Sequence, residues 1–392
     1  MSFFQVTKRS SRSRARRGVI ATDHGVVQTP AFVPVGTKAT IKSLTPAQIT
    51  DLKVQLSFVN TYHLVTHPGV EVLQQAGGVH EYAKLSVPLL SDSGGFQVFS
   101  LAQTNSRRAK LRGGEEEPLV LKINEDGVKF RSVYDGSVID FTPESSMEFQ
   151  RKIGADLLMA FDECTYYPAT HEYAEKAMER THAWLKRCLT YLDQHGNKST
   201  YGHHQFLYGI IQGGTFDDLR VESAKFIATQ LVQGVAIGGV AVGESKEEMR
   251  KQVEWVAPYL PEDKPVHLLG IGHIDDILDA VVCGVDTLDC VEPTRIARMG
   301  AVYQWTDVKR YLEGAREGTY EIDINKGMYK EDMSKIDEEC TCYACINFSK
   351  SYLHHLFKQK ELLGYTLASF HNLFTMERLM REVRVRIESS QY

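Results

Sequence analysis

The sequence predicts an α/β protein built on a (β/α)8 barrel, and two observations carry the prediction. Short apolar runs recur, each followed by polar residues or glycines, and amphipathic segments with helix-start signals lie between them. The runs are LSFVN, VPLLSD, DLLMAFDE, FLYGIIQGG, GVAIGGVAVGE, VHLLGIG and VDTLDC. Near-continuous apolar strands are typical of a parallel sheet covered on both faces, and this many units suits a closed barrel. A Rossmann-like sheet is the alternative, disfavoured because no G-x-G-x-x-G follows an early strand.

The first segments predict a basic edge and a small cap. Residues 8–17, KRSSRSRARR, form the densest basic run of the chain, which we interpret as an edge of the folded domain. An organelle-targeting peptide is the alternative, since such peptides are rich in Arg and Ser. Residues 18–37, GVIATDHGVVQTPAFVPVGT, alternate in polarity around a turn signal. They predict an antiparallel hairpin that closes one end of the barrel.

Four helix starts carry recognisable capping residues. Thr45-Pro46 precedes AQITDLKV, Thr142-Pro143-Glu144 precedes SSMEFQRKIG, Thr215 precedes FDDLRVESAKFIATQLV, and Ser245 precedes KEEMRKQVEWV. A side-chain oxygen at such a position can accept a hydrogen bond from the first turn of the helix. Residues 101–122 instead carry mixed charges and a Gly-Gly break, and they predict a long exposed loop.

The composition changes near residue 320. We therefore divide the chain into a catalytic barrel domain with its cap, residues 1–320, and a zinc-binding helical subdomain, residues 321–392. A polar stretch leads into a cysteine cluster and then two helices. The last helix has six apolar residues on one stripe, which indicates packing: Phe370, Leu373, Met376, Met380, Val383 and Ile387.

Cys340, Cys342 and Cys345 predict a structural zinc site. Three thiolates at this spacing leave room for one more ligand of a closed tetrahedral site, and three sulfur ligands leave the ion a poor Lewis acid. His354, His355 and His371 are the candidates for the fourth ligand, and spacing does not choose among them. The four other cysteines are scattered, and those beside the acids, Cys164 and Cys290, are expected to pack as small apolar residues.

Composition limits the class of protein further. The chain has 392 residues, 43% of them hydrophobic, and a formal net charge of −5, so it does not coat nucleic acid through bulk charge. No apolar run approaches the roughly 20 residues that span a bilayer, and no hydrophobic stretch follows the basic N-terminus. We expect a cytoplasmic protein without a membrane partner.

Acidic residues follow several of the predicted strands. They are Asp92, Asp162 with Glu163, Glu244 and Asp289. A single Asp after a strand is commonly a turn or helix cap. Several at the C-terminal mouth of one barrel, where barrel enzymes place their chemistry, indicate a reactive site, and paired carboxylates suit acid–base or nucleophilic work at an anomeric carbon.

Gln212 adds an amide that can both donate and accept, which suits the edge of a purine-like base. A metal-independent carbohydrate hydrolase is an alternative that explains two acids but neither the cysteine cluster nor Gln212. No P-loop, kinase set or Ser-His-Asp order is present.

Seven segments, taken in order, resemble the queuine tRNA-ribosyltransferases, also called tRNA-guanine transglycosylases, of bacterial type. They are DSGGFQ, FDECTYYPAT, YGIIQGGTFDDLR, AIGGVAVGE, HLLGIGHIDD, DCVEPTRIAR and CTCYACINFSKSYLHHL. The resemblance covers nearly the whole chain. It implies exchange of the wobble guanine in GUN anticodons of tRNA for a free 7-deazaguanine base, in queuosine biosynthesis, without cleavage of the strand.

The resemblance implies roles for matching residues. Asp289 is the expected nucleophile that forms a covalent RNA intermediate, and Asp92 is the expected general acid and base. Two displacements then retain configuration, as in a retaining glycosidase. Phe96 stacks on the base, Gly239 contacts its exocyclic side, and the other substrate-binding residues are Ser93, Gly94, Gly95, Asp162 and Gln212.

The resemblance also implies partners. The expected RNA-binding residues are Gly270, Ile271, Gly272, His273, Ile274, Asp275, Asp276, Thr294, Arg295, Ile296, Ala297 and Arg298. The implied ligands of one Zn²⁺ are Cys340, Cys342, Cys345 and His371, and the family implies a homodimer built partly by the zinc module.

Val242 favours 7-aminomethyl-7-deazaguanine as the incoming base, because eukaryotic relatives that use queuine carry glycine there. The alternatives are queuine itself, or a non-catalytic tRNA-binding subunit, which the presence of both Asp92 and Asp289 disfavours.

Overall fold

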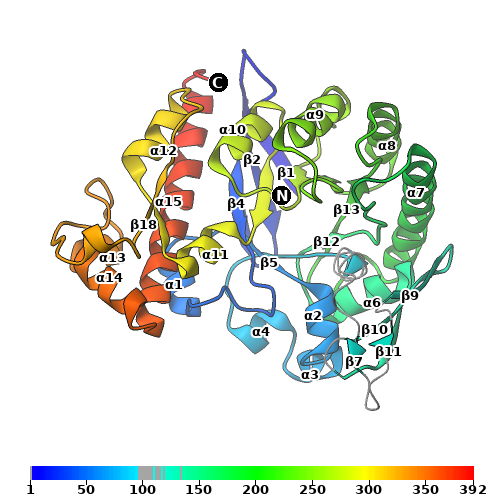
Figure 1. Cartoon of the computed structure of the whole chain (residues 1–392). Helices are drawn as coiled ribbons and strands as arrows, with labels where there is room; N and C mark the ends of the chain where they lie inside the picture. The colour runs from blue at the N-terminus through cyan, green and yellow to red at the C-terminus, as the bar shows by residue number, and fades with distance from the viewer. Residues whose placement is uncertain (1, 96–108, 111–115, 118–119, 133–134) are drawn as a thin grey trace.

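Eight parallel strands form the barrel that the sequence predicts (Figure 1). The computed structural model describes residues 2–95, 109–110, 116–117, 120–132 and 135–392. The strands lie in the order β4, β16, β15, β14, β13, β12, β6 and β5, and a parallel bridge between Val35 and Phe58 joins the last to the first. Their bounds are β4 Ala31–Pro34, β5 Ser57–Val59, β6 Leu89–Ser91, β12 Leu157–Met159, β13 Phe206–Ile211, β14 Gly234–Ile237, β15 Val266–Leu268 and β16 Thr287–Cys290.

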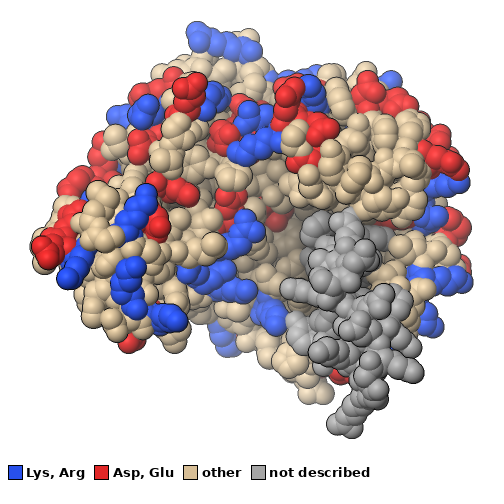
Figure 2. Space-filling view, viewed as in Figure 1, with Lys and Arg blue, Asp and Glu red and all other residues tan. Residues whose placement is uncertain are grey.

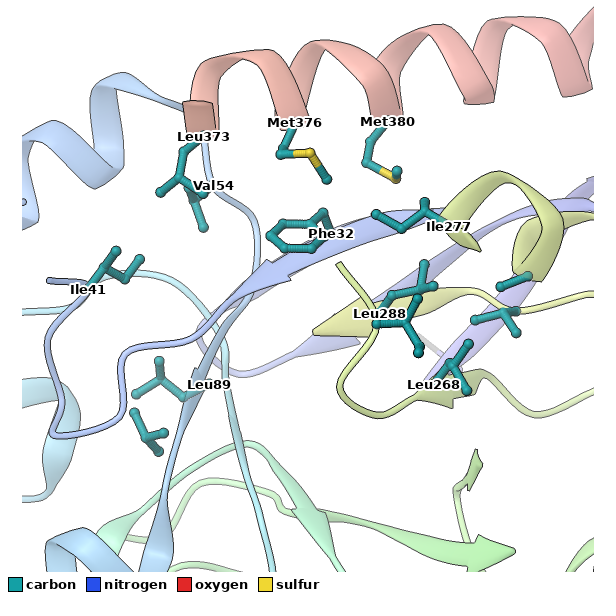
Figure 3. Close-up of a cluster of buried hydrophobic side chains, with 14 of the residues drawn as sticks. Phe32, Ile41, Val54, Leu89, Leu268, Ile277, Leu288, Leu373, Met376 and Met380 are labelled. Atoms are coloured by element: carbon teal, nitrogen blue, oxygen red, sulfur yellow. The ribbon is translucent and has the colours of Figure 1, made fainter. Parts of the chain in front are cut away.

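Each barrel strand buries both of its faces. Successive side chains point to opposite faces, so Val33 of β4 lies in the cluster that fills the lumen, whereas its neighbour Phe32 packs against the outer helices. Figure 3 shows this outer layer, with Met376 and Met380 of the long last helix above Phe32. Burial on both faces explains why the strands read as continuous apolar runs.

An antiparallel sheet closes the N-terminal end of the barrel. It consists of β1 (Phe4–Arg9), β2 (Arg16–Thr22) and β3 (Gly25–Thr29), in the order β1-β2-β3. The hairpin predicted from residue 18 is confirmed for β2 and β3, but its last part was assigned wrongly, since residues 31–34 form the first barrel strand β4. The error arose because AFVP is a short apolar run directly after a turn, and β1 was not predicted at all.

The basic run at residues 8–17 is partly interior. Arg16 is buried and forms a bidentate ion pair with Asp286, the residue before β16, with Nη2 2.6 Å from Oδ2. Arg17 lies at the surface, where it pairs with Glu388 at the C-terminus. Part of this charge therefore fixes the N-terminal sheet to the barrel rather than forming an edge.

Three of the four predicted helix starts are confirmed. Helices α1 (Pro46–Asp51), α6 (Pro143–Ile153) and α9 (Lys246–Val256) each begin with the capping box expected from Thr45, Thr142 and Ser245. Helix α8 (Asp217–Thr229) begins after Phe216, so the prediction of Thr215 as the cap was wrong by one residue. The other helices around the barrel are α2 Thr61–Thr66, α3 Val70–Gln75, α4 Val79–Ala83, α7 His171–Gln194, α10 Ile274–Val282 and α11 Glu292–Met299.

A second antiparallel sheet follows β6. It consists of β9 (Val120–Asn124), β10 (Gly127–Arg131) and β11 (Val138–Phe141). The prediction of a loop at 101–122 was therefore wrong for residues 120–122, and also for the short pair β7 (Ala109–Lys110) and β8 (Glu116–Glu117). The mixed charges suggested a loop because β9 is largely solvent-facing: each of its residues is exposed or only partly buried. The rest of 101–122 lies outside the described residues.

The C-terminal segment packs on the barrel. Strand β17 (Ala301–Tyr303) pairs with β18 (Glu321–Asp323), and the remaining helices are α12 Trp305–Leu312, α13 Tyr343–Asn347, α14 Lys350–Lys358 and α15 Leu362–Glu388. The six-residue stripe on α15 is buried, as predicted. Helix α15 begins at Leu362, so His371 lies within the helix, nine residues after its first residue. The division into domains at residue 320 stays a prediction.

Candidate active site at the barrel mouth

On several barrel strands, the apolar side chains that point into the lumen are followed at the C-terminal end of the strand by a polar side chain. Leu90 and Ile210 line the lumen, and two residues further along the same strands come Asp92 and Gln212. Asp289 follows Thr287 in the same way on β16. Because side chains alternate along a strand, these groups continue the inward rows at the C-terminal mouth, where barrel enzymes carry their chemistry. All are less than 10% exposed.

Backbone and amide N–H groups hold the Asp92 carboxylate. Asn60 Nδ2 donates to Oδ2 at 2.6 Å, and the backbone N–H groups of Thr61 and Gly94 donate to Oδ1 at 2.7 and 3.2 Å. The Thr61 hydroxyl donates to the Asp92 carbonyl at 2.6 Å. Donors on both carboxylate oxygens stabilise the ionised form.

Asp162 and Gln212 form one hydrogen-bonded unit beside Asp92. Burial raises the pKa of Asp162 to about 6, although donors to the ionised form oppose the rise. Ser93 Oγ donates to Oδ1 at 2.9 Å, and Gln212 Nε2 donates to Oδ2 at 2.8 Å. Gln212 Oε1 is buried and has no hydrogen-bond partner among the described residues. An unmatched buried acceptor is costly, so it suits a donor group on a ligand.

The close approach of backbone at this unit requires glycine. A Cβ on Gly95 would lie 2.7 Å from the Asp162 carbonyl oxygen. Gly239 has φ +62°, and a Cβ there would lie 2.3 Å from Gln212 Oε1. The DSGG and IGG glycines therefore allow the walls of the site to come together.

Arg220 braces the Gly238–Gly239 turn from behind. It is fully buried on α8, and burial lowers the pKa of its guanidinium to about 10. Nη1 donates to the Gly238 carbonyl at 2.5 Å and Nη2 to the Gly239 carbonyl at 2.7 Å. The sequence interpretation did not identify Arg220, since a single arginine in an amphipathic helix gives no signal of burial.

Asp289 is held from one side only. His267 Nε2 lies 3.0 Å from Asp289 Oδ1, and the Gly270 N–H donates to the same oxygen at 3.2 Å. His267 is fully buried, and its Nδ1 lies 2.9 Å from Thr287 Oγ1. No donor from the described residues reaches Oδ2. The sequence interpretation missed His267 too, although a histidine at an inward position of the run VHLLGIG is a signal that could have found it.

Asp92 and Asp289 face the same mouth. Phe58 of β5 lies over the His267 ring, with centroids 6.5 Å apart and 23° between the planes. His267 contacts Asp289, and Asn60, two residues after Phe58, contacts Asp92. This chain of contacts across the lumen places both carboxylates at the same, C-terminal end of the barrel.

The two other acids of the predicted set have structural partners. Glu163 forms an ion pair with Arg180 and accepts a hydrogen bond from the Tyr173 hydroxyl at 2.6 Å. Glu244 accepts from the backbone N–H groups of Ala241 and Val242 at 2.6 and 2.9 Å, which holds the loop after Gly239. These contacts occupy both carboxylates in local structure.

The cysteines beside the acids are protonated packing residues at neutral pH. Burial raises the pKa of both Cys164 and Cys290 to about 12. Cys164 lies in the main core cluster, as predicted, and the side chain of Cys290 packs against that cluster. Phe96, the predicted stacking residue, lies outside the described residues.

The two predicted RNA-contacting segments border Asp289. Residues 270–272 connect β15 to α10 beside the Asp289 carboxylate, and Thr294–Arg298 lie on α11, immediately after β16. Arg295 is exposed, whereas Thr294 and Ala297 are buried. The carboxylates of Asp275 and Asp276 turn away toward α9, where they pair with Lys246 and Arg250.

Basic side chains lie next to this border. Lys42, Arg295 and Arg298 line one depression, together with Val35, Thr37, Val291 and Thr294. Figure 2 shows Lys and Arg side chains gathered near the middle of this face. The net negative charge of the chain therefore does not prevent a local positive surface at the mouth.

Cys340, Cys342, Cys345 and His371 meet in one buried cluster. The three Sγ atoms lie 3.6, 3.5 and 3.3 Å from His371 Nδ1. Tetrahedral bonds of about 2.3 Å to sulfur and about 2.0 Å to nitrogen put these atoms about 3.5 Å apart, so the donor set and its size fit one zinc ion. His371 Nε2 donates to the Tyr303 carbonyl at 2.8 Å, which orients the ring.

The other two candidate histidines lie elsewhere. His354 is buried with Nδ1 2.7 Å from the Ile324 carbonyl oxygen, and His355 is exposed on α14. The structure thus selects His371, which spacing in the sequence did not.

A second group of possible ligands lies at the N-terminal end of the barrel. His24 Nδ1 and His80 Nε2 lie 2.7 and 3.4 Å from the two oxygens of buried Asp156. The imidazole rings are stacked, with centroids 3.7 Å apart and 10° between the planes. Imidazoles that bind one ion point toward it from different directions, so we interpret this group as a charged cluster, with a hydrogen bond between His24 and Asp156, that joins the N-terminal sheet to β12.

No helix in the described part of the chain combines the length and apolar character that crossing a membrane requires. The cluster of Cys340, Cys342, Cys345 and His371 agrees with the ligand set that the resemblance implies.

Comparisons with known proteins give the same family. The queuine tRNA-ribosyltransferase family pattern matches residues 10–392. The queuine tRNA-ribosyltransferase of Caldanaerobacter subterraneus subsp. tengcongensis is 42% identical over 388 residues, which cover 99% of this chain and 94% of that protein. The proteins of the same name from Synechococcus elongatus and Herpetosiphon aurantiacus are each 43% identical, over 99% and 100% of this chain and 92% and 91% of their own lengths. The chain therefore belongs to the queuine tRNA-ribosyltransferase family and is a tRNA-guanine transglycosylase, a pentosyltransferase.

Proposed function

We propose that this chain exchanges the wobble guanine of GUN anticodons for free 7-aminomethyl-7-deazaguanine, through an ester between Asp289 and the ribose. The observation that carries the proposal is the unequal surroundings of the two acids at one mouth. Asp289 keeps one oxygen clear of donors from the described residues, and Asp92 is bound on both oxygens.

In the first displacement, Asp289 Oδ2 attacks the anomeric carbon while the bond from that carbon to guanine N9 breaks. Protonated Asp92 gives its proton to the departing guanine, and donors from Asn60, Thr61 and Gly94 stabilise the carboxylate that results. In the second displacement, the incoming base loses its N9 proton to Asp92, and its nitrogen replaces the Asp289 oxygen. Asp92 regains its proton, and two inversions retain configuration.

Asp162 and Gln212 are proposed to read the base. An ionised Asp162 accepts from the N–H groups on the pyrimidine edge of guanine, and the Gln212 amide and the Gly239 backbone serve the adjacent edge. Ser93, Gly94 and Gly95 hold the Asp162 side of this pocket. We propose that Phe96 stacks on the base, as the resemblance implies.

The anticodon loop is proposed to bind along the α11 side of the mouth. A single-stranded loop lets the target nucleotide leave its stack at a cost of a few kcal/mol. Arg295, Arg298 and Lys42 supply positive charge for neighbouring phosphates, and the 270–272 loop contacts the nucleotide held by Asp289.

Val242 supports the aminomethyl base as substrate. It lies on the loop that Glu244 holds, with its side chain partly buried against the core. A β-branched side chain crowds the cyclopentenediol arm of queuine more than glycine does. Competition of the two free bases against labelled guanine tests this, and a preference for queuine would refute the crowding argument.

The cysteine cluster is proposed to hold one structural Zn²⁺. When bound, the ion crosslinks the 340–345 segment to α15. Through α15 and the His371–Tyr303 hydrogen bond, the cluster also stabilises the β17 strand that follows α11. We propose that residues 321–392 act as a zinc-binding subdomain packed on the barrel.

A homodimer is proposed as the functional form. Exposed apolar side chains gather on the 321–392 segment, including Met328, Met333, Tyr343, Ile346 and Leu362. Apolar surface of this kind commonly marks a protein interface. Light scattering coupled to size exclusion distinguishes a dimer from a monomer.

Exchange of labelled guanine into unmodified tRNA tests the proposed activity. We expect incorporation by the unaltered protein and none by Asp289→Asn. Binding of tRNA without any incorporation would instead support a non-catalytic tRNA-binding subunit.

A further inference from the structure

We infer that His267 is a positioning residue for the second displacement, in which the Asp289 carboxylate must leave the ribose. This inference rests on the proposed function. His267 Nε2 and the Gly270 N–H both contact Oδ1, the oxygen that becomes the ester carbonyl when Oδ2 bonds to the sugar.

The orientation of His267 is fixed on three sides. Its ring is fully buried, Phe58 lies over it at 6.5 Å, and Thr287 Oγ1 is 2.9 Å from Nδ1. In a neutral imidazole both contacts are satisfied when the Thr287 hydroxyl donates to Nδ1 and Nε2–H donates to Asp289. The ionised Asp289 carboxylate only accepts, so it selects the tautomer whose proton faces it, and the Thr287 hydroxyl supports that tautomer by donating to Nδ1.

The charge on Oδ1 differs between the two states of the enzyme. In free Asp289 it carries part of a negative charge, whereas in the ester it is an uncharged carbonyl oxygen. A hydrogen bond to a charged acceptor is about twice as strong as one to a neutral acceptor. Both donors therefore favour the free carboxylate over the ester, and they lower the barrier of the step that releases it.

The sign of this effect makes it testable. Without the His267 donor, Asp289 is a better nucleophile but a poorer leaving group, so the covalent RNA adduct accumulates while turnover falls. We expect the ratio of trapped adduct to exchange rate to rise by roughly tenfold, the difference between a charged and a neutral hydrogen bond. A purely structural defect lowers the adduct and turnover together.

Two variants address different parts of the arrangement. His267→Phe keeps a ring against Phe58 and removes the donor. Thr287→Val keeps the shape of the side chain and removes the hydroxyl that hydrogen-bonds to Nδ1 and orients the ring, so it should raise the ratio less. Leu268→Ala is the matched control, because Leu268 is equally buried on the same strand but points to the outer layer (Figure 3).

The experiment measures labelled-guanine exchange and adduct on a denaturing gel in the same reactions, with thermal unfolding to check the fold. The inference requires a raised ratio in Thr287→Val, and also in His267→Phe if that variant folds, with no rise in Leu268→Ala. Unchanged ratios would overturn it while leaving the proposed function intact. Absence of exchange and adduct in the unaltered protein would overturn the proposed function and this inference with it.

Discussion

Arg220 offers the sharpest test of how the base pocket is held together. All five of its hydrogen bonds go to uncharged oxygens, which are the carbonyls of Gly214, Ile211, Gly238 and Gly239 and the side-chain oxygen of Gln252. The guanidinium is fully buried, so its charge is stabilised by these oxygens rather than by water. Removing it leaves four backbone carbonyls without this donor in the interior.

The expected loss for Arg220→Met is about 3–5 kcal/mol of unfolding free energy. A hydrogen bond to a charged group contributes about 1.5–3 kcal/mol, and such contributions are not additive. Arg220→Met also removes the buried charge and with it a desolvation penalty of several kcal/mol. The net loss of stability is therefore smaller than the sum of the hydrogen-bond contributions. Arg220→Lys keeps a charge but has three donors instead of five, so roughly half of the loss is expected.

The assay is urea unfolding together with steady-state exchange at varied base concentration. Because the Gly239 carbonyl moves when its donor is lost, the KM for the free base should rise roughly tenfold, more than kcat falls. An Arg220→Met protein with an unchanged unfolding midpoint and an unchanged KM would refute the bracing role.

Three further outcomes follow from the structure. The hydrogen bond that His24 donates to Asp156 raises the pKa of His24 above its ordinary value of 6.5, so the stability that this pair contributes is complete below pH 6.5 and is lost as pH rises through the raised pKa. Urea midpoints of the unaltered protein should fall across this pH range, and a His24→Asn variant with the same slope would contradict the assignment. The pKa of Asp162 is about 6, so affinity for the base, measured by titration calorimetry, should decrease below that pH as the acceptor is protonated, and Asp162→Asn should bind weakly without this pH dependence. His371→Ala should release close to one zinc per chain, measured by elemental analysis, and expose residues 321–392 to protease; full zinc content would exclude the site.

The barrel could be predicted because its strands are buried on both faces and its helices carry local start signals. Seven of the eight strands read as apolar runs, and Thr45, Thr142 and Ser245 form the capping boxes expected of them. The missed strand β4 is only four residues long and follows a hairpin of similar composition. Its place in the barrel depends on pairing with β16, more than 250 residues away, which local patterns do not record.

The candidate site was predictable in its acids but not in the arginine that supports it. Asp92 and Asp289 lie at the C-terminal ends of strands and stand out against apolar neighbours, whereas Arg220 reaches the site only through tertiary packing. The fourth residue of the cysteine cluster could not be chosen from the sequence for the same reason, because His371 lies within α15 and meets the cysteines only in the folded chain.

Mass spectrometry of the covalent complex tests the central claim most directly. Protein incubated with tRNA, denatured and digested should yield a nucleotide attached to the peptide that contains Asp289, and the same treatment of Asp289→Asn should yield none. A nucleotide attached to another residue, or an adduct that persists in Asp289→Asn, would contradict the account.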